Sequence, residues 1–297
     1  MNLMMLLEMA AEGLGDRVAV GSLDDGLTYR QLYDRAHGAA NRYRAAGVES
    51  AVVCDESSPA LPIALFGSAW AGIPYVPLNY RLPADDLLAL AERAGSAVAI
   101  ADESNLERLG GLPGVSSVSA EAFSADPAAG TDEHASPGDW NMDPDDLAVL
   151  LFTSGTTGSP KSAVLRHKHL VSYILGSVEF MGAGEDEATL VSVPPYHIAG
   201  VASMLSSVYA GRRIVQLPRF DPDVWIDTVE REGVTHAMVV PTMLTRIVDA
   251  LDARGGAPML GIRALSYGGG KMPRPVIERA LDLFPITNFV NAYGLTE

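Results

Sequence analysis

Short apolar segments alternate with longer amphipathic segments along most of the chain. The segments 51–54 (AVVC), 147–152 (LAVLLF) and 213–217 (RIVQL) are apolar over a length that is typical of buried strands. The segments between them repeat apolar residues at helical spacing and are flanked by Ser, Thr, Pro or Gly, which favour helix ends. This alternation predicts a layered α/β fold with largely parallel sheets.

Several helix ends are marked by local signals. Thr28 and Gln31 have the spacing of a capping box, so a helix is expected to begin at that point. Further helices are expected at the apolar N-terminus, at 59–72 and 83–93, and near the prolines at 222, 241 and 275. Residues 110–146 are instead rich in Gly, Pro, Ser and Asp, which predicts a long surface connection.

Composition and charge narrow the class of protein. Apolar residues make up 48% of the 297 residues and charged residues 20%, which is ordinary for a soluble globular protein. The net charge of −16 argues against nucleic-acid binding, because no basic stripe is available for phosphodiesters. No apolar run approaches the length of a transmembrane helix, and the N-terminus lacks a basic leader, so a cytoplasmic enzyme is expected. The single cysteine, Cys54, lies in an apolar strand and is expected to be buried.

The segment 152–162 (FTSGTTGSPKS) combines glycines, hydroxyl side chains and a lysine after an apolar strand. Gly155 and Gly158 permit close backbone approach and Lys161 supplies a positive charge, so the loop suits a polyphosphate. It nearly fits the P-loop pattern of NTPases, but Pro160 stands where that pattern needs a glycine. The residues after Lys161 also favour a strand, whereas a P-loop lysine opens a helix. A P-loop NTPase is therefore the weaker interpretation.

Three further loops follow predicted strands, at 194–200 (PPYHIAG), 267–273 (YGGGKMP) and 291–297 (NAYGLTE). Because ligands bind at the carboxyl ends of parallel strands, the four loops together are predicted to form one site. A lone histidine such as His197 is more often structural than catalytic, and a glycine triplet is often only a turn. His167 and His169 have no nearby partner ligand, so a surface position is expected for them and not a metal site.

These four segments resemble the motifs of the adenylate-forming acyl-CoA synthetases, which are related to luciferases and to peptide-synthetase adenylation domains. The similarity runs from residue 1 to residue 297 and implies the layered αβαβα large N-terminal domain of these enzymes. It implies a subdomain at 49–183 with the phosphate loop, and a second one at 1–48 plus 184–297 with the acyl and adenine site. The implied reaction uses Mg²⁺ and ATP to convert a carboxylic acid into acyl-AMP, from which CoA takes the acyl group.

The resemblance also implies a role for individual residues. The phosphates would be held by Thr153, Ser154, Gly155, Thr156, Thr157, Gly158 and Lys161. The adenine would be held by Gly268, Gly269, Gly270, Asn291, Ala292 and Tyr293, and the α-phosphate by Thr296. Mg²⁺ would be bound by Glu297 and Thr156, because this ion prefers hard oxygen ligands. The acid would contact His197, Ile198, Val201, Gly268 and Gly269, and the catalytic residues would be Lys161, His197, Thr296 and Glu297.

The end of the chain departs from the family pattern. Family members continue past the T-E motif to a small C-terminal domain with the adenylation lysine, and this domain is absent from the 297 residues. The chain is therefore expected to be a fragment or a truncated relative, and a catalytically incomplete nucleotide- or acyl-binding module is the alternative to an active ligase. The glycines at 268–270 favour a fatty or polyketide-like acid, while an aryl acid stays open. The expected partners are small molecules, and a homodimer stays open.

Overall fold

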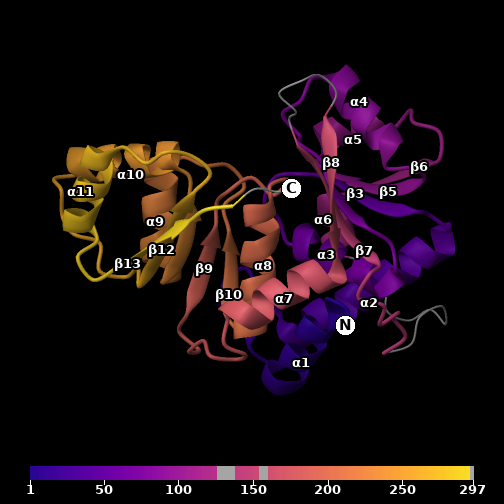
Figure 1. Cartoon of the computed structure of the whole chain (residues 1–297), viewed down its shortest axis with the longest axis horizontal. Helices are drawn as coiled ribbons and strands as arrows, with labels where there is room; N and C mark the ends of the chain where they lie inside the picture. Colours follow the sequence, from indigo (N-terminus) through magenta and orange to yellow (C-terminus); the bar gives the residue numbers. More distant parts are fainter. Residues whose placement is uncertain (126–137, 154–159, 295–297) are drawn as a thin grey trace.

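The computed structural model describes residues 1–125, 138–153 and 160–294. Its strands form two sheets, which lie on opposite sides of a helical layer (Figure 1). Sheet A has the order β13 (Asn288–Ala292), β12 (Ala264–Gly268), β11 (His236–Val239), β9 (Ala188–Val191), β10 (Arg213–Gln216), β1 (Val18–Val20) and β2 (Leu27–Thr28). Sheet B has the order β6 (Val115–Ser119), β5 (Ala97–Ala101), β3 (Ser50–Cys54), β4 (Tyr75–Pro77), β7 (Leu147–Thr153) and β8 (Lys161–Arg166). Only the pairs β1–β2 and β7–β8 are antiparallel among these strands, so the expected parallel character is confirmed.

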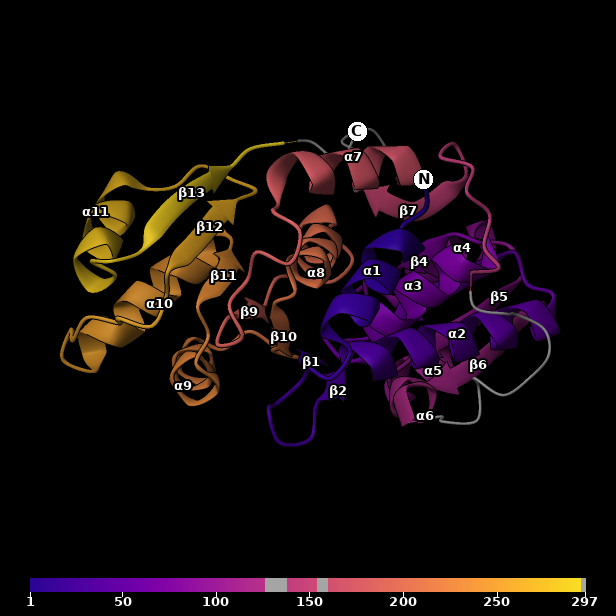
Figure 2. The ribbon, with the colours of Figure 1, turned by 90° about the horizontal axis from the view of Figure 1, so that it is seen from below.

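Helices cover both faces of the two sheets. The inner layer contains α1 (Met4–Leu14), α2 (Tyr29–Ala46), α3 (Ala60–Ala71) and α8 (Ile198–Ala210), with α6 (Ala120–Ala125) against α3 and α7 (His167–Ser177) against α8. The outer face of sheet A carries α9 (Pro222–Glu232), α10 (Pro241–Ala253) and α11 (Arg274–Leu283), and sheet B carries α4 (Ala84–Arg93) and α5 (Glu103–Leu109) (Figure 2). This is the layered αβαβα arrangement that the family resemblance implies. None of the described helices is long and apolar enough to cross a membrane.

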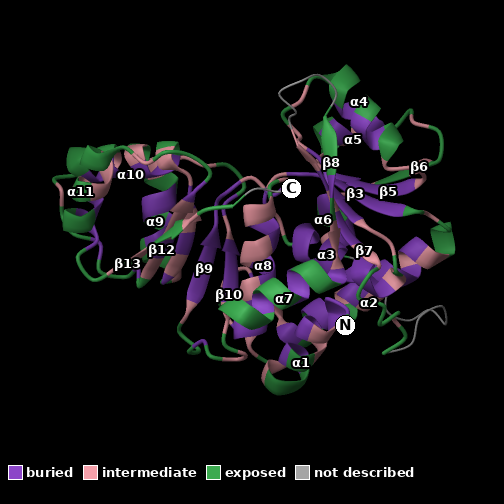
Figure 3. Cartoon of the chain, in the orientation of Figure 1, coloured by how far each residue is buried: buried purple, intermediate pink, exposed green. Residues whose placement is uncertain are grey.

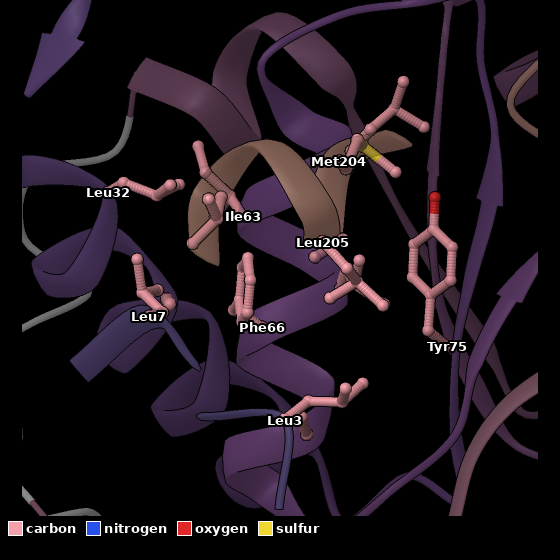
Figure 4. Packing of buried hydrophobic residues seen from close by; sticks show 14 of the residues in the cluster. Leu3, Leu7, Leu32, Ile63, Phe66, Tyr75, Met204 and Leu205 are labelled. Atoms are coloured by element: carbon pink, nitrogen blue, oxygen red, sulfur yellow. The ribbon is translucent and has the colours of Figure 1, made fainter. Parts of the chain in front are cut away.

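The main hydrophobic core lies in the inner layer. Leu7 of α1, Phe66 of α3 and Leu205 of α8 are fully buried there and point toward one another (Figure 4). Figure 3 shows the same layer as the most continuously buried part of the molecule, while β13 and α11 are largely exposed. The core therefore fixes α8, the helix that carries His197 at its start, against the layer between the two sheets.

The helix ends that the local signals predict are confirmed. Thr28 caps α2, since its hydroxyl accepts from the Gln31 N–H at 3.2 Å and the Gln31 side chain accepts from the Thr28 N–H at 2.9 Å. Asp221 caps α9 by accepting from two N–H groups of its first turn. Cys54 is buried as expected, and burial raises the pKa of its thiol to about 12.

Two expectations are wrong. The surface connection expected at 110–146 contains β6 and α6, and β6 is the edge strand of sheet B. An edge strand buries little of either face, so its serines give no apolar alternation that would reveal it. His167 is not on the surface but 1% exposed, because its Nδ1 accepts from the Leu3 N–H at 3.2 Å and ties the N-terminal segment to α7. His169 is exposed as expected.

The strands of sheet B lie between residues 50 and 166, and those of sheet A lie before residue 29 and after residue 187. The division of the chain at 49–183 into two subdomains stays a prediction.

Candidate functional site

The loops that the sequence singles out follow the carboxyl ends of neighbouring strands. Strands β9, β11, β12 and β13 are adjacent and parallel in sheet A, so their following loops share one edge of the sheet. His197 lies after β9, Gly268 ends β12, and Tyr293 follows β13. The chain leaves β13 toward sheet B (Figures 1 and 2), in which β7 and β8 precede and follow the predicted phosphate loop in sequence.

A glycine turn and an exposed aromatic ring lie side by side at this edge. Gly268 pairs with Ala292 across the ladder, and a Cβ on Gly268 would lie 2.1 Å from the Ala292 carbonyl oxygen. Gly269 has a φ of +79°, which L side chains rarely adopt. Tyr293, one residue beyond this pair, is 93% exposed. A tyrosine normally buries much of its ring, so an exposed tyrosine one residue beyond this glycine pairing suits contact with a flat aromatic ligand.

The phosphate loop is anchored at both of its described ends. Thr153 ends β7 opposite Lys161, which begins β8. Arg93, in the last turn of α4, donates to the Pro160 carbonyl oxygen at 2.7 Å, and its guanidinium lies 4.8 Å from the centre of the Phe152 ring. Residues 154–159, which include the predicted phosphate ligands Ser154, Gly155, Thr156, Thr157 and Gly158, lie outside the described residues. Arg93 is not predictable from the sequence as part of the site, because nothing near it in the chain indicates that it reaches Pro160.

His197 precedes α8 as its N-cap residue. Its imidazole is solvent-exposed, yet the protein atoms around it displace enough water to lower its pKa below the ordinary value. The ring centre of Tyr196 lies 4.7 Å from that of His197, with an interplanar angle of 56°. The imidazole is therefore accessible to a substrate and neutral at pH 7, so it can donate or accept a hydrogen bond there.

The residues predicted to contact the acid fall into two groups. His197 and Gly269 are exposed at the strand ends, while Ile198 is half-buried. Val201 is fully buried and belongs to the main core, and Ile198 packs against that core. A contact between Val201 and the acid stays a prediction. A cavity of about 740 Å³ lies elsewhere, under the β1–β2 hairpin beside Asp55, and contains none of the predicted site residues.

The predicted metal ligands, Thr156 and Glu297, are not among the described residues. Thr156, Thr296 and Glu297 all lie outside them, so their predicted roles stay predictions. Within the described part of the chain, no group of three or more His, Cys, Asp and Glu side chains could hold a metal ion. A magnesium ion that arrives with ATP needs only one or two protein carboxylates, because phosphate oxygens supply its other ligands.

An exposed tyrosine and a glycine turn that follow paired strands, at the carboxyl edge of a parallel sheet, are typical of an α/β protein that binds a ligand at this edge. The chain belongs to the AMP-binding enzyme family, whose model matches residues 7–297. A feruloyl-CoA synthase from an Amycolatopsis species is 32% identical over 275 residues, which are 91% of this chain and 54% of that protein. A fatty acid–[acyl-carrier-protein] ligase from Streptomyces coeruleorubidus is 29% identical over 283 residues, again 91% of this chain and 54% of that protein.

A solved structure gives the same picture. The O-succinylbenzoate coenzyme A synthetase of Bacillus subtilis, in complex with ATP and magnesium ion, matches with a TM-score of 0.75 and 25% identity over 92% of this chain and 56% of that one. The chain thus spans about half the length of the curated relatives it matches.

Proposed function

We propose that the chain is the acid-activating part of an AMP-forming carboxylic acid–CoA ligase. The carboxylate of the acid attacks the α-phosphorus of ATP, the bond between the α- and β-phosphates breaks, and acyl-AMP and pyrophosphate form. The thiolate of coenzyme A then attacks the acyl carbon, and AMP leaves with the electron pair of the carbon–oxygen bond. Such a reaction depends on positioning and on neutralisation of charge more than on a protein nucleophile.

The observation that carries this proposal is the exposed Tyr293, which follows the strand paired with Gly268, at the carboxyl edge of sheet A. The flat ring and the glycine backbone would hold adenine, which directs the triphosphate toward Lys161 at the start of β8. His197 lies on the same edge of the sheet. Because its imidazole is neutral, it would donate a hydrogen bond to the acid without attracting the negatively charged phosphates. Mg²⁺ bound to ATP would neutralise the phosphate charge.

The proposal also includes the class of carboxylic acid and the acceptor of the acyl group. The relatives that support an aryl and a fatty substrate are the feruloyl-CoA synthase and the fatty acid ligase. We infer an uncharged acyl tail, CoA as the acceptor, and a cytoplasmic location. Small molecules are then the only partners that the reaction requires.

The experiment compares the products formed from ATP. The 297-residue chain is incubated with Mg²⁺, ATP and a panel of aryl and fatty acids, and nucleotides and pyrophosphate are separated by chromatography. AMP and pyrophosphate that appear only with an acid support the proposal. ADP as the product overturns it in favour of a P-loop NTPase. ATP binding without any turnover overturns it for this chain in favour of a catalytically incomplete binding module.

A further inference from the structure

A row of aromatic rings connects the two sheets at the candidate site. The ring of Tyr196 lies against the His197 imidazole, as given above. On its other side, the Tyr80 ring meets Tyr196 edge to face, with 5.7 Å between ring centres and an interplanar angle of 74°. The Arg81 guanidinium lies 5.3 Å from the centre of the Tyr80 ring. We call the three rings of Tyr80, Tyr196 and His197 the aromatic row.

The two ends of the row come from different sheets. Tyr80 follows β4 of sheet B, whereas Tyr196 and His197 follow β9 of sheet A. Both loops are fixed locally. The Asn79 side chain accepts from the Arg81 N–H at 3.0 Å, and the Pro194 carbonyl accepts from the His197 N–H at 3.2 Å. The row therefore joins two backbone positions that are each held in place by a local hydrogen bond.

The imidazole of His197 has no other visible support. Within the described residues no hydrogen bond holds either ring nitrogen of His197, and Tyr196 supplies its aromatic contact. Aromatic pairs prefer edge-to-face or offset geometry, so the contact with Tyr80 restricts the rotation of Tyr196, which in turn restricts the imidazole. Tyr80 and Arg81 also line a polar cavity of about 380 Å³, which leaves space on the far side of the row.

We propose that Tyr80 is a positioning residue, which acts through Tyr196 to orient the His197 imidazole across the junction of the two sheets. The kinetic consequence of this role rests on the proposed function, but the orientation itself does not. Neither Tyr80 nor Arg81 belongs to any of the four motifs, and Tyr80 reaches His197 from a position 117 residues earlier in the chain.

The same contact affects the titration of His197. Burial among neighbouring protein atoms is what lowers the pKa of His197, and no charged group of the described residues contributes to that shift. The other titratable groups of the aromatic row are Tyr196 and Tyr80, and the charged Arg81 lies over the Tyr80 ring. Burial also raises the pKa of Tyr196, so this phenol stays neutral at pH 7. Loss of the Tyr80 ring would admit water beside Tyr196 and raise the pKa of His197 toward its ordinary value.

The first test uses nuclear magnetic resonance on the 297-residue chain. The imidazole signal of His197 is assigned by its disappearance in His197→Asn, and its shift and titration are then followed in three variants. In Tyr80→Ala the signal is expected to lose the ring-current shift from Tyr196 and to titrate at higher pH. Tyr80→Phe keeps the edge-to-face contact and is expected to match the unchanged chain. Tyr173→Ala removes a tyrosine that is 57% exposed on α7, and serves as the matched control.

An unchanged His197 signal in Tyr80→Ala, in a chain that still melts cooperatively, overturns the proposal. Equal changes in Tyr80→Ala and Tyr173→Ala also overturn it, because the effect would then be general. Where acid activation is measurable, Tyr80→Ala should lower kcat by about 10-fold to 100-fold with a smaller change in the KM for ATP, and Tyr80→Phe should restore it. A shifted His197 signal in a chain that activates no acid supports the positioning role and counts against the proposed function alone.

Discussion

Replacement of Arg93 by alanine tests whether the phosphate loop is held from outside its own motif. The Arg93 guanidinium donates a hydrogen bond of 2.7 Å to the Pro160 carbonyl and stacks on the Phe152 ring. Phe152 and Pro160 lie on either side of the loop in sequence. A net hydrogen bond contributes about 0.5–1.5 kcal/mol, and a cation–π contact at an exposed site about 0.5–1 kcal/mol. Arg93 is exposed, so we take a total of about 1–2 kcal/mol.

That energy sets the expected effect on nucleotide binding. If both contacts keep the loop in the conformation that receives ATP, their loss lowers the equilibrium constant for that conformation by a factor of about 5–30. The expected result for Arg93→Ala is a rise of up to that size in the ATP dissociation constant, with little change in kcat at saturating ATP. Arg93→Lys keeps the charge but loses the planar guanidinium, so it should recover only part of the affinity.

The assay is titration calorimetry with ATP, with a parallel thermal melt. Arg279→Ala is the matched control, because Arg279 also lies near the end of an exposed helix and pairs with Asp252, far from the phosphate loop. Unchanged ATP affinity in Arg93→Ala would refute the reasoning. A lowered melting temperature with unchanged affinity would show instead that Arg93 supports only the packing of α4.

Four further predictions concern particular residues. The buried imidazole of His167 has its pKa lowered from 6.5 to about 4, so its stabilising contribution, on the order of 3 kcal/mol, is complete above about pH 6.5 and is lost as the pH falls toward 4. Urea unfolding from pH 7.5 to 4.5 should show a weaker pH dependence in His167→Asn, and an equal dependence would contradict this. Lys161→Ala should slow adenylation at least tenfold, with a melting temperature within about 2 °C of the unchanged chain. Lys168→Ala, which removes a surface pair with Asp145, should change neither the rate nor the melting temperature. Gly269→Ala should destabilise the chain by about 1 kcal/mol and slow all acids alike, because its φ is +79°. Gly270→Ala has ordinary contacts and should slow long acids selectively if this turn faces the acyl chain, so equal rates for short and long acids would remove the turn from the acyl pocket.

Sequence reasoning succeeded wherever the signal was local. The capping box of Thr28 and Gln31 needs only the residues within one helical turn, and the cap at Asp221 likewise depends on its own first turn. Apolar strands that are buried on both faces, such as β3, are visible as continuous runs. Strand β6 is the counterexample, because an edge strand satisfies its backbone on one side only and needs no apolar alternation.

The placement of the motifs could also be predicted from the sequence, since the order of strands and helices fixes which loops share an edge of a parallel sheet. The structural reason for an individual glycine could not be predicted. The sequence favours the glycines at 268–270 as part of the acyl site, but it does not indicate that the Ala292 carbonyl oxygen would lie 2.1 Å from a Cβ at Gly268. This close approach depends on the register between β12 and β13, and a register cannot be read from one strand alone.

The residues that support the site share one property, which explains why no motif contains them. Arg93 reaches Pro160 across 67 residues of sequence, and Tyr80 reaches Tyr196 across a still longer interval. Both supports come from loops or helices of sheet B, while the residues that they hold are the phosphate loop and the His197 segment. Contact with a ligand restricts a residue type through chemistry, so it produces a recognisable motif. A residue that only contacts a ligand-binding residue is restricted in shape and charge, and several residue types can meet that restriction. Differences in activity between proteins with the same four motifs are therefore expected to originate at positions such as 80 and 93.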